Sequence, residues 1–152
     1  MGFLVGAGKH EEAYGRVWRW FALGFGISAA IVLILNLVKA PLLGLFTDDP
    51  AIVAYAGAAL LVGLLLEPGR NLNTIIIPAL KGSGDTLFPV CVGILFQWGV
   101  GVFLAWLFGL RLGLGLAGIW LALSCDEWSR GIIMAFRWRS GAWRSKVLIR
   151  AE

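Results

Sequence analysis

Two long stretches without a charged side chain constrain this sequence more than any other feature. Trp20–Val38 runs for 19 residues and Leu87–Leu110 for 24 residues without Asp, Glu, Lys or Arg. As a helix, the shorter stretch would be about 28 Å long, which is enough to cross the hydrocarbon core of a bilayer. Of all residues 59% are hydrophobic and 14% are charged, whereas soluble domains average roughly 45–50% and 25%. The sequence therefore predicts an all-α integral membrane protein.

Four membrane-spanning helices are expected, separated by polar turns. Asp49 and Pro50 form a strong helix start, with Asp49 as the N-cap and Pro50 as the first helical residue. The span that follows should be a single helix kinked at Pro68 and Pro78, because two shorter pieces could not cross the bilayer. The predicted spans are about residues 17–38, 51–80, 87–110 and 112–136, followed by a basic tail over 137–152.

A polar turn separates the second and third spans and carries the most distinctive local sequence. Lys81 is the only basic residue between Arg70 and Arg111. Gly82 and Gly84 allow backbone angles that other residues resist, and Asp85 or Thr86 could cap the next helix. The turn is therefore expected to reverse the chain sharply, and its residues are structural candidates.

Charged residues inside the predicted spans are the main functional candidates. Glu67 and Arg70 are three apart on the second span, and Arg130 is four from Asp126 and three from Glu127 on the fourth. Each spacing places opposite charges on one helix face. A lone charge at the centre of a spanning helix costs roughly 2.5–3.5 kcal/mol, so these groups need partners or water. The two acid–arginine clusters should lie at similar depth in the membrane.

Two interpretations of these clusters remain open from the residues alone. They are either structural ion pairs that fix helix register or parts of an ion or substrate pathway. If the clusters face each other, Arg130 could exchange between its own acids and Glu67, as a coupling ion or proton would require. Asn71 and Gln97, the remaining polar candidates for the pathway, lie in otherwise apolar stretches.

The sequence carries no signature of a soluble enzyme or of a metal site. His10 is the only histidine and lies in a polar terminus, and Cys91 and Cys125 are isolated in apolar runs. No Ser/His/Asp set, phosphate-binding glycine loop or metal-ligand spacing is present. We therefore expect neither an enzyme nor a protein-bound cofactor or metal.

The distribution of basic residues predicts the orientation of the chain. With four spans, both termini and the polar turn lie on one side of the membrane. That side holds nine Lys or Arg residues, whereas the other holds only Lys39 and Arg111. Basic loops favour the cytoplasm, so both termini are expected in the cytoplasm and the protein in the inner (plasma) membrane. A basic and aromatic tail directly after a span is expected to anchor at lipid headgroups, and no nucleic-acid partner is expected.

Four short motifs together resemble the multidrug and toxic compound extrusion (MATE) family of transporters. Val5–Ala13 (VGAGKHEEA) resembles the segment after the second helix of each lobe in that family. Leu45–Pro50 (LFTDDP) is similar to a loop of the family, and Leu80–Thr86 (LKGSGDT) resembles its glycine turn. Gly115–Trp120 (GLAGIW) matches the start of the last helix. The motifs occur in the family's order, with the predicted spans between them, over residues 5–146.

This resemblance implies a fold and a function for the chain. Family members have twelve helices in two lobes and exchange cationic drugs or metabolites for Na⁺ or H⁺. The four spans resemble the last four helices, so the chain is expected to be a partial carboxy-terminal lobe that is inactive without the missing amino-terminal helices. An acid that binds the coupling cation in some members would fall near Arg70, one turn from Glu67. The alternative is a small four-helix membrane protein or subunit that does not transport.

Overall fold

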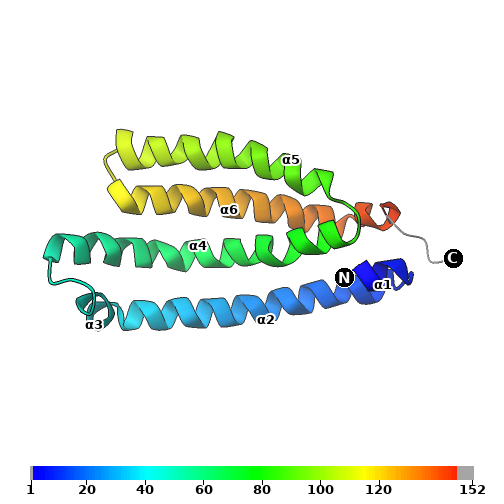
Figure 1. Ribbon diagram of the computed structural model, residues 1–152, viewed down its shortest axis with the longest axis horizontal. Coiled ribbons are helices and arrows are strands. Elements are labelled where there is room, and N and C mark those ends of the chain that lie inside the picture. The colour runs from blue at the N-terminus through cyan, green and yellow to red at the C-terminus, as the bar shows by residue number, and fades with distance from the viewer. Residues whose placement is uncertain (1, 147–152) are drawn as a thin grey trace.

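The computed structural model describes residues 2–146 as a bundle of long helices joined by short turns (Figure 1). The long helices lie side by side, and both described ends of the chain lie at the same end of the bundle as the turn between α4 and α5. The described residues contain no strand, which confirms the all-α prediction. The elements are α1 (Gly2–Gly6), α2 (His10–Leu37), α3 (Lys39–Gly44), α4 (Pro50–Gly82), α5 (Leu87–Phe96), η1 (Gln97–Val102), η2 (Ala105–Arg111), α6 (Gly115–Arg139) and η3 (Ala142–Ser145).

Three helical segments are long and apolar enough to cross a membrane: His10–Leu37, Pro50–Gly82 and Leu87–Arg111. The α6 helix has 25 residues and lies alongside them, but its middle carries the cluster of Asp126, Glu127 and Arg130. Membrane-length apolar helices are thus present at three of the four predicted positions.

The start of α4 has the predicted form. The Asp49 carboxylate accepts a hydrogen bond from the Ala51 N–H at 2.8 Å, and Pro50 is the first helical residue. The helix then continues without interruption to Gly82, past Pro68 and Pro78. This confirms one long helix rather than two short ones.

The polar turn reverses the chain as predicted, but Asp85 does not cap α5. Gly84 adopts a φ of +93°, a conformation that suits glycine. The carboxylate of Asp85 is 4% exposed and accepts hydrogen bonds from Arg137 Nε at 2.7 Å and Nη2 at 3.3 Å. Thr86 occupies the cap position and makes no side-chain cap bond. The capping prediction was wrong because a guanidinium fork on α6 binds this buried carboxylate more strongly than a backbone N–H would.

A packed aromatic core closes the end of the bundle that holds the termini. After α6, Gly141 adopts a φ of +70° and turns the chain back, so that Trp143 stacks on Trp138 with ring centroids 4.2 Å apart. Both indoles are fully buried, and Trp143 Nε1 donates to the Trp138 carbonyl at 2.9 Å. The headgroup anchor stays a prediction, and these two aromatic side chains are packed inside the bundle. Residues 147–152 of the predicted tail lie outside the described part of the chain.

Candidate functional site

The α4 and α6 helices run in the same direction and touch where the sequence places the charges (Figure 1). A side chain at Gly69 would lie 2.8 Å from the Trp128 ring, and one at Gly131 would lie 2.8 Å from Leu72 Cβ. Trp128 Nε1 also donates to the Leu65 carbonyl at 2.8 Å. Glycine on each side therefore lets the backbones approach closely at this level, as small residues do in membrane bundles.

The acid–arginine cluster of α6, formed by Asp126, Glu127 and Arg130, is largely buried. Arg130 Nη2 donates to Asp126 Oδ2 at 2.5 Å and lies 3.2 Å from Glu127 Oε1. The side chains of Asp126, Glu127 and Arg130 are 1%, 18% and 15% exposed. Two carboxylates share one guanidinium, so the cluster has a net charge of −1 when every group is ionised. Both predicted pairings on this helix are present.

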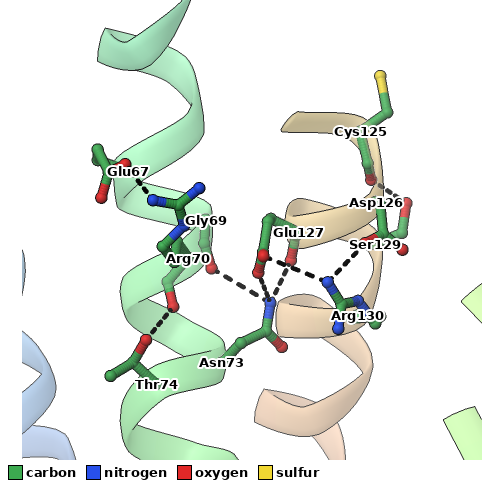
Figure 2. A network of polar contacts seen from close by, with 10 residues as sticks. All are labelled: Glu67, Gly69, Arg70, Asn73, Thr74, Cys125, Asp126, Glu127, Ser129 and Arg130. Carbon is green, nitrogen blue, oxygen red and sulfur yellow. Dashed lines mark hydrogen bonds and ion pairs between the residues drawn. The ribbon is translucent and has the colours of Figure 1, made fainter. Parts of the chain in front are cut away.

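Asn73 connects this cluster to α4 and was missed from the sequence. Its Nδ2 donates to Oε2 and to the backbone carbonyl of Glu127, both at 2.7 Å, as Figure 2 shows. The residue is 5% exposed. A sequence signal did exist: Asn73 follows Leu66 by seven residues and precedes Ile76 and Leu80 by three and seven, which is the spacing of one buried helix face.

The acid–arginine cluster of α4, the pair of Glu67 and Arg70, stands apart from that of α6. Arg70 Nη1 donates to Glu67 Oε1 at 2.7 Å, and the side chains are 25% exposed for Glu67 and 44% for Arg70. Figure 2 shows the Glu67 side chain on the side of α4 away from α6. Arg130 makes its ion pairs with Asp126 and Glu127 instead. The structure does not support the exchange of Arg130 between Glu67 and its own acids.

The remaining candidates lie at other contacts of the bundle. Asn71 Nδ2 donates to the Phe21 carbonyl at 3.1 Å and so ties α4 to α2. Gln97 is exposed at the first residue of η1. The turn at the far end of α4 lies away from both acid–arginine clusters and is formed by Lys81, Gly82, Gly84, Asp85 and Thr86.

A cleft of about 450 Å³ opens between α2, α4 and the indole of Trp120 on α6. Its walls are largely apolar, and among the described residues that line it Glu67 alone is charged. Asn36 also lines it and donates to the Leu60 carbonyl at 2.9 Å. Among residues 2–146 no group of three or more His, Cys, Asp or Glu side chains is arranged to hold a metal ion.

Comparisons with known proteins relate this sequence to a known family. The MatE family model matches residues 1–107. An uncharacterized transporter, YisQ, of Bacillus subtilis (strain 168) is 42% identical over 146 residues, covering 96% of this chain and 32% of the relative. A probable multidrug resistance protein NorM of Pseudomonas putida (strain KT2440) is 32% identical, covering 100% and 34%. Another NorM, of Neisseria meningitidis serogroup B (strain MC58), is 30% identical, covering 81% and 27%.

The chain therefore spans about a third of the length of the curated relatives it matches. No solved structure matches the chain. The match to the family model ends before α6, so the cluster of α6 lies beyond it.

Proposed function

The chain belongs to the MatE family of membrane transporters, and we propose from this premise that it forms the carboxy-terminal helices of a cation-coupled multidrug antiporter. Two of its relatives are named as probable multidrug resistance proteins. The family points to a transporter rather than an enzyme. The proposal is that the whole transporter exports small organic cations in exchange for Na⁺ or H⁺, and that these helices supply part of its pathway.

The observation that carries the coupling proposal is the buried cluster of α6. Charges inside a membrane bundle are expensive, and a net charge of −1 has no counter-charge of its own in the cluster. A structural pair would need one acid for one arginine, whereas here Asp126 and Glu127 share Arg130. An extra acid in this position suits a site that alternately holds and releases a positive charge.

The cleft supports a cationic substrate. Its apolar walls suit an organic molecule, Glu67 supplies a negative charge, and the Trp120 ring offers a face that attracts cations. Arg70 holds Glu67 at 2.7 Å, so a cationic ligand would have to compete with that arginine. Asn71 and Gln97 remain predicted pathway residues.

We further propose that α6 is the fourth span and that both termini lie in the cytoplasm, in the inner (plasma) membrane. The basic side of the chain supports this orientation. With Cys91 and Cys125 replaced, a cysteine at Asp48 should react with an impermeant thiol reagent added outside cells, and one at the exposed Thr86 should not. The reverse pattern would exclude the orientation.

The missing part of the pathway is proposed to be the amino-terminal helices of the same transporter. Four of twelve helices would be a third of a transporter, which fits the coverage of the relatives, 32% and 34% for two of them. Residues 1–152 alone should then export no ethidium from cells. A chimera in which they replace the matching segment of Pseudomonas putida NorM should export it.

Two outcomes would contradict the proposed function. Ethidium export from proteoliposomes that contain only this chain would remove the need for further helices. A chimera that inserts in the membrane at normal abundance but exports nothing would favour the alternative, a four-helix membrane protein or subunit without transport activity.

A further inference from the structure

Among the described residues, two polar atoms in the cluster of α6 are buried without a hydrogen-bond partner, Asp126 Oδ1 and Arg130 Nε. Asp126 is 1% exposed, and its Oδ1 is buried without a donor among the described residues. Its other oxygen, Oδ2, accepts from Arg130. An ionised carboxylate accepts hydrogen bonds at both oxygens, so leaving one of them unpaired in a dry interior is costly.

The acid next to it is fully satisfied. Glu127 Oε1 lies 3.2 Å from Arg130 Nη2, and Oε2 accepts from Asn73 Nδ2 at 2.7 Å. The cluster has one more carboxylate than it has guanidinium groups. If one proton neutralises this excess, the unpartnered oxygen of Asp126 is where it fits, because protonation converts an acceptor that lacks a donor into a donor.

Among residues 2–146, no charged group other than Glu127 and Arg130 is found beside Asp126. Asp126 is packed toward η1 of the neighbouring rod, where a side chain at Gly101 would lie 3.5 Å from its Cγ. No residue from Leu87 to Leu110 is charged, and the nearby polar side chain of η1 is the amide of Gln97. From α4 the cluster receives the uncharged Asn73, and Glu67 is occupied by Arg70. Glu127 and Arg130 are therefore the charged groups that act on Asp126.

The neighbouring backbone is itself unusual. Gln97–Val102 forms a π-helical turn within the third predicted span. Such turns are rare, are often found at functional sites, and change which carbonyls the helix pairs internally. Asp126 therefore packs against an uncharged π-helical turn whose nearby polar side chain is Gln97.

We propose that Asp126 Oδ1 binds a single proton and is the site at which this segment carries the coupling cation. A proton taken from water forms the Oδ1–H bond, leaves the cluster neutral, and leaves Arg130 to balance Glu127. Release of that proton restores the charge of −1 on the cluster. That negative charge favours the binding of a cationic substrate at the membrane depth of the two acid–arginine clusters. The role in transport rests on the proposed function, whereas the proton site itself can be measured without transport.

The donor set favours a proton over a metal ion. Hard metal ions take a shell of several oxygen ligands. Here the guanidinium of Arg130 lies directly against Asp126, and one carboxylate oxygen is free. A proton needs only that oxygen.

The test is infrared spectroscopy of the 152-residue chain in lipid nanodiscs at neutral pH. A protonated carboxyl has a carbonyl stretch that an ionised one lacks. We expect a band equivalent to one carboxyl per chain, which shifts when aspartate is ¹³C-labelled and stays in place when glutamate is labelled. This arm needs no substitution, so it does not depend on a variant that folds.

Substitutions sharpen the assignment. Asp126→Asn should abolish the band, and Glu127→Gln should abolish it too, because Arg130 then balances Asp126. Asp48→Asn, changed at an exposed loop carboxylate, should retain the full band. Absence of the band at neutral pH, or a shift on glutamate labelling, would overturn the proposal.

Measuring the band in the presence of Na⁺ distinguishes a proton from sodium as the bound ion. Comparing the band with transport by the chimera distinguishes the proton site from the proposed function. Replacing choline by Na⁺ at constant ionic strength should leave the band unchanged, and its loss would assign the site to sodium instead of a proton. A normal band together with a chimera that does not transport would refute the proposed function and leave the proton site standing. Transport by the chimera together with the absence of the band would refute the proton site and leave the proposed function standing.

Discussion

The two acid–arginine clusters are built from the same residue types at nearly the same spacing, yet their surroundings differ. On α4, the side chains of Glu67 and Arg70 are 25% and 44% exposed, beside an open cleft. On α6, Asp126 is 1% exposed, and Arg130 has two acids to balance. The spacing along a helix determines which charges pair. The residues packed around the pair determine how exposed it is and whether its charges are balanced. Only the cluster of α6 is both buried and unbalanced.

The largest predicted effect tests this difference with one substitution in each cluster. Arg130→Gln removes the only cation of the cluster and should lower the free energy of unfolding by about 3–5 kcal/mol. Arg70→Gln, which breaks the more exposed pair, should cost about 1 kcal/mol or less. Unfolding of each variant in mixed micelles measures both values. Equal losses would mean that the two clusters share the same environment.

The link across the helices gives the next largest effect. Asn73→Ala removes the amide that donates twice to Glu127, and a hydrogen bond to a charged group is worth about 1.5–3 kcal/mol. Asn71→Ala, two residues away, removes a bond to the neutral Phe21 carbonyl and should cost about 0.5–1.5 kcal/mol. The same unfolding assay compares them. A larger loss at Asn71 would show that α2, rather than α6, holds α4 most firmly.

A smaller effect tests the close approach that brings Asn73 and Glu127 together. Gly131→Ala places a methyl 2.8 Å from Leu72 Cβ and 3.2 Å from the Gly69 carbonyl. Overpacking of this kind costs about 1–3 kcal/mol. Gly57→Ala meets only Leu43 Cδ1 at 3.9 Å and should stabilise α4 by about 0.5–1 kcal/mol. If both substitutions stabilise the chain, the helices are not in close contact at Gly131.

Much of the fold could be predicted because the relevant physics is local. Charge-free stretches of membrane length, the Asp49–Pro50 start and the glycine turn each depend on a few consecutive residues, and each is present in the structure. The pairing of Arg130 with acids three and four residues away is equally local.

The parts that could not be predicted depend on neighbours distant in the sequence. Asp85 has the form of a helix cap, and only the position of α6 reveals that Arg137 binds it. Trp138 and Trp143 resemble an interfacial anchor until Gly141 folds one onto the other.

The candidate site shows the same limit. The first half of α4 is apolar on nearly every face, so periodicity did not single out the side that packs on α6. Asn73 was missed although its spacing marks a buried face, because its partner Glu127 is 54 residues away in the sequence. Spacing along one helix also does not decide whether the two clusters face each other, and Glu67 points away from α6.

The most direct test of this account is a pair of double-mutant cycles on the free energy of unfolding. Asn73→Ala with Glu127→Gln should show a coupling energy of about 1 kcal/mol or more, because the two side chains share a hydrogen bond. Glu67→Gln with Arg130→Gln should be additive within about 0.5 kcal/mol, because the structure pairs each with other residues. Strong coupling of Glu67 with Arg130, and additivity of Asn73 with Glu127, would contradict the account.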